Sequence, residues 1–194
     1  MKIIIISLVY LTICFSSVFA SEYEYTGGAS LTVSNFAVQF DDGKTNKQIV
    51  ISPVTLFGEI QTDRINKFHL SWRLLDYHVD ASQSGKLGAD IYGNQIELTW
   101  LRKARLSRKI KPWFGLGLRA SYLKSTFRHT IDADGFLDKR FDKHNQTYLA
   151  AIIKSHIAWE IRQFWFLDLA VSYDQPLGNG VGGFGVSSGA KYLY

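Results

Sequence analysis

The chain has very little cysteine. Its 194 residues include one, Cys14, in an N-terminal segment that we expect to be removed. Residues 21–194 therefore have no thiol with which to form a disulfide, even in a compartment that would permit one. An alternative is a lipoprotein leader that is acylated at Cys14. Such a leader has a small residue before its cysteine, whereas this chain has Ile13.

Long apolar runs are also missing after residue 20. No stretch there has eighteen consecutive apolar residues, so the sequence predicts no membrane-spanning helix. The formal net charge is +5, and no run of lysine and arginine suggests a nucleic-acid partner. Helical periodicity is poor, whereas aromatic residues make up 14% of the chain and glycines punctuate it. This composition favours an all-β protein.

The first twenty residues have the order of a secretory signal peptide. Lys2 gives a short positive start, an apolar stretch covers residues 3–15, and Ala20 supplies the small residue at the cleavage position. The apolar stretch is too short for a membrane anchor, and no stop-transfer charges follow it. We therefore expect a signal peptide over residues 1–20 and one mature domain over residues 21–194.

The end of the chain, residues 181–194, alternates with a period of two. One parity is largely apolar or aromatic and the other is small or polar, as expected of a strand between an apolar and a polar medium. The first parity contains Phe184, Val186, Ser188, Ala190, Tyr192 and Tyr194; the second contains Gly185, Ser187, Gly189, Lys191 and Leu193.

Seven earlier segments share this alternation, and the connections between the eight strands are alternately long and short. Short turns on one side and longer loops on the other are typical of an up-and-down transmembrane barrel. Each strand has about ten residues or more, enough to cross a bilayer when tilted. The expected strands cover residues 29–40, 49–61, 67–78, 91–106, 112–124, 146–161, 164–175 and 181–194.

Two irregularities are expected within these strands. The alternation of the first strand changes phase at Ser34-Asn35, which predicts a β-bulge there. Pro53 lacks the N–H that a strand interior requires, so a bulge or a strand end is expected at that position.

Two motifs in the sequence indicate a protein family. The chain ends in Lys-Tyr-Leu-Tyr, and residues 111–118 read Lys-Pro-Trp-Phe-Gly-Leu-Gly-Leu. With these motifs the chain resembles the small eight-stranded outer-membrane proteins of the OmpA, OmpX and OmpW type. The resemblance implies the bacterial outer membrane, contact with its lipids and lipopolysaccharide, and an assembly signal at Tyr192 and Tyr194 for the barrel-assembly machinery. It implies no single activity, and the oligomeric state stays open.

Aromatic residues gather toward both ends of the expected strands. Two such belts are required at the two interfaces of a membrane. Tyrosines mark the outer end, and the periplasmic belt is predicted to contain Trp72, Trp100, Trp113, Trp159 and Trp165. The alternative is a soluble β-sandwich or lipocalin-like barrel, whose apolar parity would face a protein core.

The polar parity predicts a charged network inside the barrel. Eight strands leave a lumen that side chains can fill, so we interpret this network as a structural plug. The alternative is a narrow hydrophilic path, with Gly115 and Gly117 opening space. The predicted network contains Arg73, Glu97, Arg119, Lys154, His156 and Asp168, with Lys103, Glu160 and Asp174 on the same parity.

Strand register gives specific pairs, because opposed residues of antiparallel neighbours have a constant index sum. The turns predict Glu97 opposite Arg119, Arg73 opposite Glu97, and His156 opposite Asp168. We therefore expect an Arg73–Glu97–Arg119 cluster and a His156–Asp168 pair inside the barrel.

The expected loop 125–145 carries Asp132-Ala-Asp-Gly. A calcium loop would need another oxygen ligand where Phe136 stands, and a distal glutamate. We expect a solvated tip there, in a charged surface for which lipopolysaccharide phosphates are an alternative partner.

No histidine has a metal-ligand spacing, and no serine–histidine pair of a lipid hydrolase is evident. The sequence thus predicts no catalytic residue, metal or cofactor. Our first hypothesis is a non-enzymatic structural or surface-interaction protein of the outer membrane. The alternatives are a passage for small, perhaps hydrophobic, molecules and a lipid-A-modifying enzyme.

Overall fold

The computed structural model describes residues 24–39, 45–81, 86–104, 112–178 and 183–194, with the backbone alone at 36–39, 45–48 and 53. The expected signal peptide, its cleavage site after Ala20 and Cys14 lie outside these ranges. Among the described residues no helix is both long enough and apolar enough to cross a membrane.

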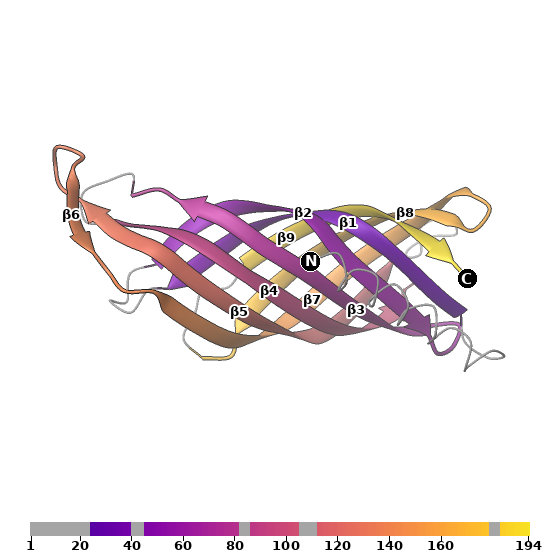
Figure 1. Ribbon diagram of the computed structural model, residues 1–194. Coiled ribbons are helices and arrows are strands. Elements are labelled where there is room, and N and C mark those ends of the chain that lie inside the picture. Colours follow the sequence, from indigo (N-terminus) through magenta and orange to yellow (C-terminus); the bar gives the residue numbers. More distant parts are fainter. Residues whose placement is uncertain (1–23, 40–44, 82–85, 105–111, 179–182) are drawn as a thin grey trace, which may run out of the picture.

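Antiparallel strands form one closed barrel (Figure 1). Each strand pairs with its neighbours, β1 pairs with β9, and the β4–β5 pairing completes the circle. Eight strands make the wall, as predicted, and β6 is a short extra strand on the end of β5. The strands are β1 (Glu24–Gln39), β2 (Thr45–Gln61), β3 (Asn66–Val79), β4 (Leu87–Lys103), β5 (Trp113–Ile131), β6 (Leu137–Arg140), β7 (His144–Arg162), β8 (Trp165–Pro176) and β9 (Gly183–Leu193).

The two ends of the barrel differ. One end, here called the turn end, carries the connection at residues 62–65, the tight β7–β8 turn with Phe164 at φ 68°, and the last residue, whose N–H donates to the Tyr25 carbonyl at 3.0 Å. At the other end, the loop end, the β5–β6 hairpin extends beyond the rest of the barrel (Figure 1). This asymmetry agrees with short turns on one side and longer loops on the other.

Burial in this barrel is the reverse of that in a water-soluble protein. Apolar side chains on the outside are exposed, such as Leu116 at 62% and Ile153 at 60%, while polar ones point inward and are buried, such as Gln95 at 2%. An apolar surface that continues around a whole barrel requires an apolar surrounding medium. The soluble alternative is therefore wrong, because the charged parity, not the apolar one, fills the interior.

The predicted bulge in the first strand is wrong, and the one at Pro53 is confirmed. The β1–β2 register runs unbroken past Ser34 and Asn35. It shifts instead where Ser30 and Thr32 on β1 face Thr55 and Ser52 on β2, so that the extra residue lies in β2 beside Pro53. A bulge leaves a residue outside the ladder, which suits a residue without an N–H.

Several strands reach further toward the loop end than predicted. β4 begins at Leu87 rather than residue 91, and β5 continues to Ile131 rather than ending near residue 124. A second bulge lies in β5, where Phe127 has φ 49°. The predicted loop 125–145 is therefore wrong in extent, since most of it belongs to the paired β5, β6 and β7 strands.

Candidate functional site

The inside of the barrel holds a buried network of charged side chains. It lies on the inward positions of seven strands, β2 to β5 and β7 to β9, and all its members are at most 8% exposed. The network includes the six residues predicted from the sequence, Asp174 from the same predicted parity, and four more, Glu59, Lys67, His69 and Lys191. Glu160 was expected on that parity too, but it is exposed at the end of β7.

Glu59 on β2 is the first centre of this network. Its carboxylate accepts hydrogen bonds from the ammonium groups of Lys67 at 2.8 Å and Lys191 at 2.7 Å, and from the Thr26 hydroxyl at 3.0 Å. His69 Nδ1 lies 3.3 Å from the same carboxylate. A carboxylate so surrounded stabilises the cations that face it, and these cations in turn offset the cost of burying it.

Glu97 on β4 is the second centre. Its Oε2 accepts from Arg119 Nη2 at 2.9 Å, and its Oε1 accepts from Lys154 at 2.8 Å and from the Thr99 hydroxyl at 3.1 Å. Arg119 also donates from Nη1 to Asp174 Oδ1 at 2.9 Å. The network thus ties β4, β5, β7 and β8 together across the lumen.

Two histidines join the two centres. The Lys154 ammonium is 2.8 Å from His69 Nε2, and the Lys67 ammonium is 2.6 Å from His156 Nε2. An ammonium group can only donate, so both Nε2 atoms accept, and the proton of each neutral ring is on Nδ1. Both Nδ1–H groups then face Glu59 Oε1, at 3.3 Å and 3.5 Å.

Glu59, His69 and His156 also form a candidate metal site, because one ligand atom from each lies within 4.8 Å of the others. A carboxylate and two imidazoles are ligands that zinc accepts. The surroundings do not fit a divalent cation, however. The ammonium groups of Lys67 and Lys191 already occupy the Glu59 oxygens, and those of Lys67 and Lys154 lie against the Nε2 atoms of the two histidines.

The predicted register is correct for one strand pair and wrong by two residues for the others. Glu97 faces Arg119, as predicted. Arg73 faces Gln95 rather than Glu97, and its Nε donates to the Gln95 side-chain oxygen. The Arg73–Glu97–Arg119 cluster is therefore wrong in its first member.

His156 and Asp168 are likewise not directly opposed. His156 faces Ala170, and Asp168 faces Ala158. The pair still meets diagonally, with His156 Nδ1 3.7 Å from Asp168 Oδ1. Side chains two positions apart on neighbouring strands remain within reach when they are long.

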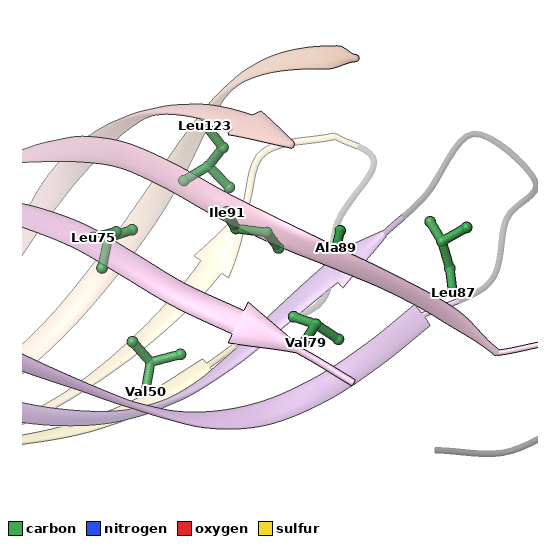
Figure 2. Packing of buried hydrophobic residues seen from close by; sticks show 7 residues of the cluster. All are labelled: Val50, Leu75, Val79, Leu87, Ala89, Ile91 and Leu123. Atoms are coloured by element: carbon green, nitrogen blue, oxygen red, sulfur yellow. The ribbon is translucent and has the colours of Figure 1, made fainter. Parts of the chain in front are cut away.

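The interior at the loop end is apolar, whereas the sequence predicts a charged interior. Seven buried hydrophobic side chains point into the lumen there and pack together (Figure 2), with Tyr77 and Tyr148 against them. They are Val50, Leu75, Val79, Leu87, Ala89, Ile91 and Leu123. Ile91 and Leu123 share the inward parity of Glu97 and Arg119, so the alternation itself contained this signal.

A different set of residues is buried inside the turn end. Leu101 and Pro112 are fully buried, and Trp113 is 7% exposed, with the Lys67 ammonium 4.4 Å from its ring centroid. The assignment of Trp113 to the periplasmic belt is therefore wrong, because its side chain faces the lumen and a lysine.

The other predicted belt residues lie on the outer surface. Trp100, Trp159 and Trp165 are exposed near the turn end, while Trp72 is half-buried further along β3. Trp165 contacts the C-terminal aromatics, with its ring centroid 5.3 Å from that of Tyr192, which lies 5.2 Å from the ring of Tyr194. Aromatic side chains with polar tips suit the boundary between lipid and water.

Side chains of the described residues fill much of the lumen. A side chain at Gly115 would meet Leu101, and one at Gly117 would meet Thr99, so both glycines accommodate neighbours rather than open space. A cavity of about 30 Å³ lies within the charged section. Such a volume holds about two water molecules, and buried apolar side chains lie on both sides of it along the lumen.

Beyond the barrel, the β5–β6 hairpin exposes aromatic side chains. Asp132 organises its tip by accepting hydrogen bonds from the N–H groups of Asp134 at 3.0 Å and Phe136 at 2.8 Å, and Gly135 takes φ 87°. Asp132 thus stabilises the turn through these hydrogen bonds, as expected of a solvated hairpin tip. Phe127 is 79% exposed and Phe136 73%.

On the outer wall near the loop end, His78 lies between two aspartates. Its Nδ1 is 2.5 Å from Asp90 Oδ1, and its Nε2 is 3.0 Å from Asp80 Oδ1. The hydrogen bond to Asp90, with the charge of both carboxylates, raises the pKa of His78 above its ordinary value. Because both ring nitrogens face acidic groups, neither is placed to take a proton from a serine.

No family model matches the chain, and no curated protein sequence matches it. Solved structures do match. Neisserial surface protein A has a TM-score of 0.56 at 12% identity, covering 90% of this chain and 98% of that one. Ail, the attachment invasion locus protein of Yersinia pestis, has a TM-score of 0.53 at 11% identity, covering 89% and 97%. The chain therefore has the fold of the small eight-stranded outer-membrane barrels.

Proposed function

We propose that the protein is an integral barrel of the bacterial outer membrane that acts without catalysis, as a structural or surface-interaction protein. The exposed apolar wall is evidence for insertion into lipid. The salt-bridged interior is evidence for a rigid barrel that holds the loop end in place. The β5–β6 hairpin is the main evidence for surface interaction, because exposed phenylalanines outside an apolar medium mark a binding surface.

Its route to the membrane follows from the expected signal peptide and C-terminal strand. We propose cleavage after Ala20, recognition of Tyr192 and Tyr194 by the barrel-assembly machinery, and contact with outer-membrane lipids and lipopolysaccharide. Terminal sequencing of membrane-extracted protein should give Ser21 as the first residue. An acylated Cys14 would instead show a lipoprotein.

The filled lumen argues against the passage of small molecules. Single-channel recording in planar bilayers should show little or no conductance for the purified barrel. Stable ohmic steps would overturn the structural role of the interior and favour a channel.

The hairpin can be tested with matched surface variants. Replacing Phe136 and Phe141 with serine removes two exposed rings beyond the barrel, while Ile161→Ser changes an exposed apolar residue at the turn end. Ail has been crystallised with sucrose octasulfate, a heparin analogue, so a heparin-coated surface is a suitable first probe. Cells with the hairpin variants should adhere less than cells with native protein or with Ile161→Ser. Equal adhesion of all three would leave the hairpin without this role.

The catalytic alternative has its own measurement. Mass analysis of lipid A from cells with and without the protein should show no difference if the barrel acts without catalysis. A modified lipid A that depends on the protein would refute the non-enzymatic proposal.

A further inference from the structure

Arg73 differs from every other cation of the charged interior. It is 6% exposed, and no carboxylate of the described residues lies within salt-bridge distance of its guanidinium. Its Nε donates to the uncharged Gln95 side chain, and its Nη2 has no hydrogen-bond partner. A buried charge without a counter-charge is costly, so a native structure normally supplies one.

The same imbalance follows from counting charges. Among the described residues of the buried network there are four carboxylates and five lysine or arginine side chains. Each of the other four cations contacts at least one carboxylate directly, so Arg73 is the one cation of the five without a direct carboxylate contact. The carboxylates are Glu59, Glu97, Asp168 and Asp174; the cations are Lys67, Arg73, Arg119, Lys154 and Lys191.

Arg73 lines the cavity of about 30 Å³. Hydroxyl groups make up much of the remaining wall, and hydroxyls can donate to an anion. Glu97 and Asp168 also line it, but Glu97 contacts Arg119 and Lys154, and Asp168 lies 3.3 Å from Lys191. The hydroxyl-bearing residues of the wall are Ser30, Thr32, Thr55, Ser71, Ser172 and Ser187.

We propose that this cavity binds one small monovalent anion of the halide class, held by the Arg73 guanidinium and the surrounding hydroxyls. The cavity takes about two particles of the size of water, and chloride is close to water in size. Sulfate and phosphate are too large for the same space and carry more charge than the one excess cation requires. The bound halide completes the charge balance of the barrel interior.

Bromide gives a direct test, because it replaces chloride and scatters anomalously. Crystals of the full-length mature barrel grown in sodium bromide should show one anomalous peak beside Arg73 inside the lumen. A cavity that contains only water, with bromide confined to the surface, would overturn the proposal.

Gln95→Glu is the most informative variant. It keeps the size of the residue that already contacts Arg73 and places a carboxylate against the guanidinium. The barrel should fold, and the internal bromide peak should disappear because the excess charge is neutralised. Retention of the peak in Gln95→Glu would show that Arg73 does not hold the ion.

Solution measurements extend the test to variants that do not crystallise. At constant ionic strength, replacing gluconate with chloride should raise the unfolding temperature of the native barrel, by about 3–6 °C for each tenfold increase in chloride above its dissociation constant. Gln95→Glu and Arg73→Gln should lose this dependence, whereas Arg102→Gln, which removes an exposed cation of the same type, should keep it. A native barrel equally stable in both salts would contradict the proposal.

Discussion

Glu97 and Arg119 face each other across β4 and β5, with 2.9 Å between Oε2 and Nη2, and both side chains are buried. Lys154 contacts the other oxygen of Glu97 at 2.8 Å. The Glu97 carboxylate therefore binds two cations, Arg119 from β5 and Lys154 from β7, inside the lumen.

Glu97→Gln should destabilise the barrel by about 3–5 kcal/mol, the range for breaking a buried ion pair. The variant keeps the side-chain shape but leaves Arg119 and Lys154 without the charge between them. Urea unfolding in lipid vesicles, followed by tryptophan fluorescence, measures the loss. Glu160→Gln is the control, because Glu160 is exposed at the end of β7; equal effects of the two substitutions would refute the role given to Glu97.

Ile91→Ala should cost about 2–5 kcal/mol, because it leaves a cavity in the apolar cluster that fills the loop end. Ile96→Ala on the same strand is the matched control. Its side chain is 51% exposed on the outer wall, where surrounding lipid can fill the space. If the same unfolding assay gave the larger loss for Ile96→Ala, the packing in Figure 2 would not explain the stability of the loop end.

The β3–β4 tip should loosen as the pH rises. The Asp90 hydrogen bond raises the pKa of His78, so its contribution is fully present below the ordinary histidine pKa of about 6.5 and is lost as the pH passes through the raised folded value. An NMR titration of the ring, with amide hydrogen exchange of Val79 and Ala89, measures both effects. Asp90→Asn should bring the pKa back toward its ordinary value, and an unchanged titration in this variant would contradict the assignment.

Replacing Tyr192 and Tyr194 with aspartate should prevent normal insertion. The change places charge where the C-terminal aromatics contact Trp165 and each other, and charge on the lipid-facing surface is unfavourable. Heat-modifiable gel migration of membrane fractions reports insertion. Phenylalanine at both positions retains the rings and should insert normally; normal insertion of the aspartate variant would show that these tyrosines are not an assembly signal.

The period-two alternation determined much of the fold from the sequence. It fixed which parity of each strand faces the lumen, because neighbouring side chains of a strand point to opposite sides. The number of strands and the inward position of Arg73, Glu97 and Arg119 followed from this local rule. Trp113 follows the same rule, because it shares the inward parity of Gly115 and its side chain is buried in spite of its aromatic character.

The alternation could not determine the register. A slip of two residues leaves every side chain on the same face, so Arg73 opposite Glu97 and Arg73 opposite Gln95 are equally consistent with the pattern. Only the β4–β5 register was predicted correctly, and the pairs across β3–β4 and β7–β8 were each wrong by two.

Contacts across the lumen depended on the tertiary structure alone. Glu59 and His69 are directly opposed across the β2–β3 hairpin, whereas His156 on β7 is distant in the sequence and meets them because barrel closure sets the stagger of the strands. The bulge beside Pro53 changes the parity of β2 and brings Glu59 inward. The lack of a salt bridge between Arg73 and any described carboxylate has the same origin, since a two-residue difference in register decides whether a guanidinium faces a glutamate or a glutamine.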